Sequence, residues 1–114
     1  MTDLNLMPHI NVEEGIARAM GKVELYRMLL EKCDLTQMIE SLKVAMSTNA
    51  LKDVTSHAHA IKGLAANLAF PTLQSVTYQI EVLSKGGMNP THLEKDLKAA
   101  VDGINQAIAA ILGT

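Results

Sequence analysis

Apolar residues recur at three- and four-residue steps along most of the chain, a spacing that places them on one face of an α-helix. The first such stripe predicts a short helix over 12–20, capped by Asn11 with Glu14 three residues later. Over 22–46 the spacing continues, and it predicts either one long helix or two helices with a break near Asp34.

Three further helices are expected in the second half of the chain. The polar turn 47–49 offers N-cap residues for a helix over 50–68. The next helix begins at Pro71, whose ring suits a first helical turn, and stops before a Gly-Gly pair. The last helix starts near Asn89-Pro90 and is capped at Gly113. Four substantial helices joined by short turns predict an all-α protein, an antiparallel up-down four-helix bundle with a short additional N-terminal helix.

The composition fits one helical domain over 1–114 and excludes several functional classes. The 114 residues are 48% hydrophobic but only 3% aromatic, and the net charge is -2. We therefore expect no nucleic-acid partner, because the chain lacks both basic residues in excess and stacking aromatics. No segment approaches the roughly 18 apolar residues of a membrane span, so we expect a cytoplasmic protein with no membrane partner. The single cysteine, Cys33, is expected to be a buried, inert thiol.

One face of the predicted helix over 50–68 carries residues that core packing does not explain. On a helical wheel His59 lies well outside the apolar arc. Gly63, one turn later, costs a helix interior about 1 kcal/mol relative to Ala and leaves space beside the imidazole. Lys62 can bring an ammonium near the same ring. A lone exposed histidine usually has no special role, but a nucleophilic nitrogen with one cation and open surroundings suits a phosphoryl acceptor for a docked macromolecule.

The segment 58–65, Ala-His-Ala-Ile-Lys-Gly-Leu-Ala, resembles the A-H-x-[LI]-K-G-x-A core of histidine phosphotransfer (HPt) domains. The similarity extends upstream to 12–18 and 24–30, and downstream to Leu73 and 79–81. It thus covers nearly the whole chain, and the helical phase of the central motif strengthens it.

The resemblance implies roles for individual residues. His59 would be the phosphorylated residue, Lys62 its electrostatic partner, and Gly63 the gap that admits a response-regulator receiver domain. Glu81 matches a position where family members often have an acidic or amide residue that hydrogen-bonds the imidazole. From the residues alone, a solvated helix face is an equal alternative for Glu81.

A docking surface is expected around His59 from small and apolar side chains on two helices. Ala66 and Ala69 depart from the family pattern, because many members have Gly there: Ala66 would slightly narrow this surface, and Ala69 concerns the helix end. The predicted partner-binding residues are Thr55, Ser56, Gly63, Ala66, Gln74 and Tyr78.

The predicted function is that of a phosphorelay intermediate rather than an enzyme with its own catalytic cycle. His59 would accept a phosphoryl group from a receiver-domain aspartyl phosphate, or from a kinase, and pass it to another receiver. The expected partners are response-regulator receiver domains and a hybrid histidine kinase, and the protein is expected to be a monomer. It would need no cofactor of its own, since Mg²⁺ would be bound by the partner receiver.

Other chemistries fit the sequence less well. His57 and His59 point about 200° apart on a helix and cannot chelate one ion, and His9 and His92 lack matching ligands, so we predict no metal site. There is no phosphate-binding loop and no hydrolase nucleophile motif. Two alternatives remain: the phosphotransfer segment of a chemotaxis-type histidine kinase, and a helical adaptor that is never phosphorylated. The initial Met and the capped last helix favour a complete small protein over such a segment.

Overall fold

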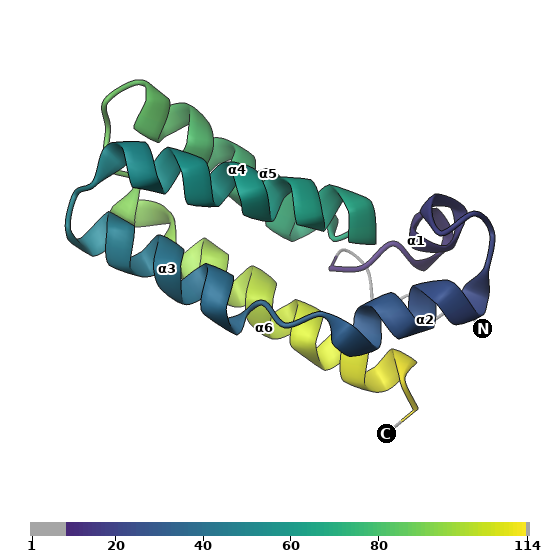
Figure 1. Ribbon diagram of the computed structural model, residues 1–114. Coiled ribbons are helices and arrows are strands. Elements are labelled where there is room, and N and C mark those ends of the chain that lie inside the picture. Colours follow the sequence, from purple (N-terminus) through teal and green to yellow (C-terminus); the bar gives the residue numbers. More distant parts are fainter. Residues whose placement is uncertain (1–8, 114) are drawn as a thin grey trace.

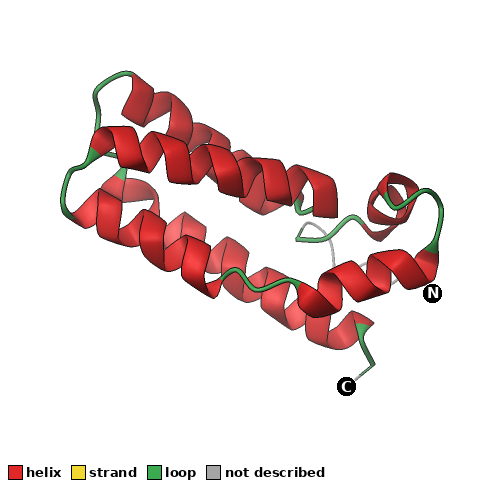
Figure 2. Cartoon of the chain, in the orientation of Figure 1, coloured by secondary structure: helices red, strands yellow, loops and turns green. Residues whose placement is uncertain are grey.

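The computed structural model describes residues 9–113, and within them every regular element is a helix (Figure 2). The elements are α1 (Val12–Arg18), α2 (Val23–Lys32), α3 (Thr36–Ser47), α4 (Leu51–Leu68), α5 (Pro71–Lys85), the 3₁₀ helix η2 (Thr91–Leu93) and α6 (Glu94–Ile111). The predicted all-α class is confirmed.

The helices α3, α4, α5 and α6 form the four-helix bundle, each antiparallel to the next (Figure 1). The most extensive contact in the molecule joins α4 and α5, which lie side by side over α3 and α6. The helix α2 lies just outside the bundle, at the end where α3 begins. The helix α1 covers the same end, near the last turn of α4. The α4–α5 pair thus presents one long outer surface.

The segment between 22 and 46 forms two helices that are separated near Asp34. This is one of the two alternatives that the sequence predicted. Cys33 leaves the helix with extended backbone, at φ −71° and ψ 121°. The Asp34 carboxylate then accepts a 3.0 Å hydrogen bond from the Thr36 backbone N–H, which lowers the pKa of Asp34 and helps to start α3. Cys33 is half-buried rather than buried, and burial raises the pKa of its thiol, which disfavours the reactive thiolate.

The capping predictions have mixed outcomes. The Asn11 side chain accepts a 3.2 Å hydrogen bond from the Glu14 N–H, as expected. The predicted N-cap for α4 is wrong, because α4 follows Ala50 and has no side-chain cap. Ser47 and Thr48 instead donate their hydroxyls to backbone carbonyls of the last turn of α3. Both hydroxyls donate to the Val44 carbonyl, which also accepts from the Thr48 backbone N–H.

The residue that ends α4 has a backbone conformation that is unusual for a residue with a side chain. Ala69 has φ 61° and ψ 54°, the left-handed conformation that glycine adopts most readily. The Phe70 N–H then bonds the Ala65 carbonyl at 2.8 Å, which closes the helix end. Ala69, which stands where many family members have Gly, therefore lies at the helix end as predicted. Its side chain strains the left-handed backbone there.

A buried tyrosine joins three helices at the end of the bundle. Tyr26 on α2 donates its hydroxyl to the Leu68 carbonyl at the end of α4, at 2.7 Å. Its ring lies directly against Gly15 of α1, where a Cβ would overlap the ring atoms. Burial raises the pKa of Tyr26 to about 12.

Candidate functional site

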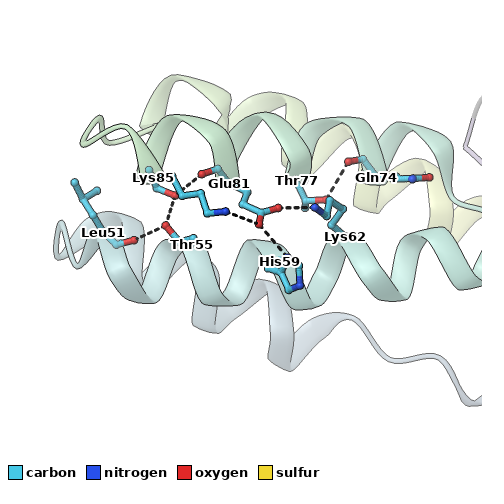
Figure 3. Close-up of polar contacts among 9 residues, drawn as sticks. Leu51, Thr55, His59, Lys62, Gln74, Thr77, Glu81 and Lys85 are labelled. Atoms are coloured by element: carbon cyan, nitrogen blue, oxygen red, sulfur yellow. Dashed lines mark hydrogen bonds and ion pairs between the residues drawn. The ribbon is translucent and has the colours of Figure 1, made fainter.

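The candidate site lies where His59 and Lys62 of α4 face Glu81 of α5 (Figure 3), and Tyr78 precedes Glu81 by one turn. His59 and Lys62 are three residues apart on α4, and Tyr78 and Glu81 are three residues apart on α5. Residues at this spacing share one face of a helix. Because α4 and α5 pack along their length, the structure brings the two pairs together.

The Glu81 carboxylate is the centre of the cluster. It is buried, with only 8% of its side chain exposed, and each oxygen faces a different group on α4. Oε2 lies 2.9 Å from Nδ1 of His59, and Oε1 lies 2.7 Å from Nζ of Lys62. The hydrogen bond from Lys62 lowers the pKa of Glu81, burial opposes this effect, and the His59 contact lowers the pKa further. Of the two alternatives for Glu81, the solvated helix face is therefore wrong.

These contacts determine which imidazole nitrogen is available. An ionised carboxylate can only accept hydrogen bonds, so Nδ1 of His59 must donate its proton to Glu81. In the neutral ring the unprotonated nitrogen is then Nε2. With 68% of the His59 side chain exposed, that nitrogen is open to an approaching molecule. The arrangement orients an exposed imidazole through a hydrogen bond to a buried carboxylate.

The surroundings of Gly63 are open, as the helical wheel predicted. A Cβ built at this position would have no heavy atom within 4 Å. Gly63 is exposed and one turn from His59, so no side chain projects from this position beside the imidazole. Nothing in the packing of the described residues requires glycine here.

The remaining predicted partner-binding residues differ in their exposure. Ser56, Gln74 and Tyr78 are exposed, whereas Ala66 is half-buried. Thr55 is half-buried as well, and its Oγ1 lies 2.6 Å from a hydroxyl on α5 while also donating to the Leu51 carbonyl. Thr55 therefore links α4 to α5 beside the site (Figure 3).

Two contacts of the cluster were not predicted from the sequence. Nζ of Lys85 lies 4.0 Å from Oε2 of Glu81, the same oxygen that faces His59. The i,i+4 spacing of Glu81 and Lys85 was an available signal for this pair. The ammonium of Lys62 also lies over the Tyr78 ring, 5.6 Å from its centroid, a contact between helices that spacing along one helix does not reveal.

The other histidines lie apart from this cluster. His57 is half-buried and lines a hollow between α3 and α4. His9 is half-buried, its Nδ1 lies 3.1 Å from Oγ1 of Thr72, and its ring fills the space beside Gly103. Within 9–113, no three His, Cys, Asp or Glu side chains gather in a way that could hold a metal ion. No helix in the same range is long and apolar enough to cross a membrane.

Comparisons with known proteins agree with this architecture. The Hpt domain family model matches residues 24–112. Among solved structures, the HPt domain of an Hpt sensor hybrid histidine kinase from Shewanella is similar in fold, with a TM-score of 0.68 and 23% sequence identity, covering 96% of this chain and 92% of that one. No curated protein sequence matches. The family match spans most of the chain, including both helices of the cluster, and the chain belongs to the Hpt domain family, whose members carry phosphoryl groups on histidine in phosphorelays.

Proposed function

We propose that this protein is a phosphorelay intermediate in which Nε2 of His59 accepts a phosphoryl group from the aspartyl phosphate of one receiver domain and passes it to another. The observation that carries the proposal is the 2.9 Å contact between Nδ1 of His59 and the buried Glu81 carboxylate. It holds the ring in one tautomer and leaves an exposed nitrogen as the nucleophile.

The transfer step follows from this arrangement. The lone pair on Nε2 of His59 forms the N–P bond while the bond between phosphorus and the aspartyl oxygen breaks, and that electron pair leaves with the aspartate carboxylate. The proton on Nδ1 stays in the hydrogen bond to Glu81. The carboxylate charge offsets the positive charge that the ring gains.

Lys62 would supply the charge that complements the incoming phosphoryl group. Its ammonium and the His59 ring contact the two oxygens of the same Glu81 carboxylate, which keeps the cation in the neighbourhood of the ring. Lys62 and Glu81 together are neutral, and Lys85 adds a further cation at 4.0 Å from the carboxylate. The cluster is thus suited to an anionic group.

The partner would supply the rest of the chemistry. We infer that the donor is a receiver domain carrying its own Mg²⁺, and that a hybrid histidine kinase lies upstream of it. The open surface at Gly63 and the exposed side chains of Ser56, Gln74 and Tyr78 support docking of a folded domain over His59.

The test is to incubate the purified protein with a phosphorylated receiver domain and Mg²⁺, alongside His59→Gln and His57→Gln variants. Acid-labile, alkali-stable label is expected on the parent and on His57→Gln, whose substituted residue is half-buried on the same helix, and not on His59→Gln. Coupling between ³¹P and ¹⁵N should then identify Nε2 as the bonded atom. Label that survives the His59→Gln change, or a phosphoryl group on Nδ1, would contradict the proposal.

A further inference from the structure

The Lys62 ammonium contacts two groups on α5, a carboxylate and an aromatic ring. Its Nζ lies 2.7 Å from Oε1 of Glu81 and over the face of the Tyr78 ring, 5.6 Å from the ring centroid. Only 26% of the Lys62 side chain is exposed, compared with 68% for His59. The lysine is therefore confined although it lies at the surface.

These two contacts of Lys62 arise from helix geometry. Tyr78 and Glu81 share a face of α5, so an ammonium from α4 that reaches the carboxylate also meets the ring. The face of an aromatic ring is electrically negative and attracts a cation within about 6 Å of its centroid. Without the ring, the flexible four-carbon stem of Lys62 would be held at one point only, the carboxylate.

We propose that Tyr78 is a positioning residue for phosphotransfer, whose ring confines the Lys62 ammonium beside His59 before the phosphoryl group arrives. This role rests on the proposed function of His59. Because 56% of Tyr78 is exposed, a docked receiver would cover the ring and exclude water from the contact. A cation–π contact becomes stronger when it loses water, so docking would tighten the hold on Lys62 at the moment of transfer.

Tyr78 also lines a shallow surface hollow of about 460 Å³ with Lys62, Pro71, Gln74 and Ser75. A role in docking alone is therefore the competing explanation. The two roles differ in a measurement that involves no partner, because a docking residue has no effect on a free phosphorylated protein.

The experiment compares Tyr78→Phe, which keeps the ring, with Tyr78→Leu, which removes it. Each protein is phosphorylated with phosphoramidate, a small chemical donor, and the hydrolysis of its phosphohistidine is followed after the donor is removed. Lys62→Ala should shorten the lifetime of the phosphohistidine. Tyr78→Leu should shorten it in the same direction by about two- to fivefold, the change that a cation–π contact at an exposed site supports, and Tyr78→Phe should stay near the parent.

A second measurement tests the contact in the unphosphorylated protein. The protons of the Lys62 side chain beside the ammonium should show an upfield ring-current shift in the parent and in Tyr78→Phe, which Tyr78→Leu removes. In a Lys62→Ala background, adding Tyr78→Leu should have no further effect on the phosphohistidine lifetime.

The outcomes distinguish the proposed phosphorylation of His59 from the proposed positioning role of Tyr78. A parent protein that takes no label on His59 would overturn the proposed function and the role of Tyr78 with it. A labelled parent with the same lifetime as Tyr78→Leu would overturn the positioning role alone. So would equal effects of Phe and Leu, or a Tyr78→Leu effect that persists without Lys62.

Discussion

The open position of Gly63 gives a prediction in which stability and function change in opposite directions. Glycine inside a helix is about 0.8–1.0 kcal/mol less favourable than alanine. Gly63 lies within α4, and a Cβ there meets no atom within 4 Å, so no clash offsets the gain. Gly63→Ala should therefore raise the free energy of unfolding by about 1 kcal/mol.

The gain converts to a measurable shift in melting temperature. The unfolding entropy of a 114-residue chain is about 240 cal/mol/K near 60 °C, so 1 kcal/mol corresponds to a rise of about 4 °C in Tm. Gly63→Gln should also be more stable than the parent, by a smaller amount, because glutamine is a good helix former. Thermal unfolding followed by circular dichroism measures both shifts.

Phosphotransfer should respond in the other direction. A glutamine side chain at Gly63 lies one turn from His59 on the surface where a receiver would dock. Overfilling a packed contact costs about 1–3 kcal/mol, which corresponds to a loss of about 5- to 150-fold in kcat/KM for the receiver. Phosphorylation by phosphoramidate, which needs little space, should remain near the parental rate.

Ala99→Gln provides the matched control, because it adds a glutamine at an exposed position of α6. It should leave transfer from the receiver at the parental rate. If Gly63→Gln also transfers at the parental rate, the docking explanation for this glycine is refuted. If Gly63→Ala fails to raise Tm, the inference that its surroundings are open is refuted.

Three further predictions concern the packing and the charges of the fold. Gly15→Ala should lower the free energy of unfolding by about 1–3 kcal/mol, measured by urea denaturation, because its methyl would overlap the Tyr26 ring; an unchanged midpoint would contradict this packing. Tyr26→Phe should cost about 1–3 kcal/mol by leaving the Leu68 carbonyl without its donor. Because the Tyr26 pKa is raised from 10 to about 12, the parent should also lose stability as the pH rises through this range, and Tyr26→Phe should lose less; parallel alkaline profiles would argue against the raised pKa. The pKa of Glu81 is lowered from its ordinary 4.5, so its charge contributes stability above that pH, which is lost as the pH falls through the folded-state value. Glu81→Gln should therefore flatten the acid side of the stability profile, and a profile as steep as that of the parent would rule out this contribution.

Features that depend on a single helix could be predicted from the amino-acid sequence. The 3.6-residue period fixes which residues share a face, so the exposure of His59 and the positions of Lys62 and Gly63 beside it follow from spacing alone. The same period predicted the helices of the bundle, but it left open whether 22–46 is one helix or two with a break near Asp34. Turn residues were less decisive: the hydroxyls of Ser47 and Thr48 can bond either the preceding carbonyls or the following N–H groups, and the structure shows that they bond the former.

Contacts between helices could not be predicted in this way, because they depend on how the helices pack. Whether Glu81 faces solvent or the imidazole depends on the rotation and axial register of α5 against α4, which the packing of the whole core sets. The same register places the Lys62 ammonium over the Tyr78 ring and brings Thr55 of α4 into contact with a hydroxyl on α5. These residues are 16 to 29 positions apart in sequence, and no local period relates them. The exposed histidine can therefore be predicted from one helix, whereas its contacts with the charged groups of α5 exist only once the bundle has formed.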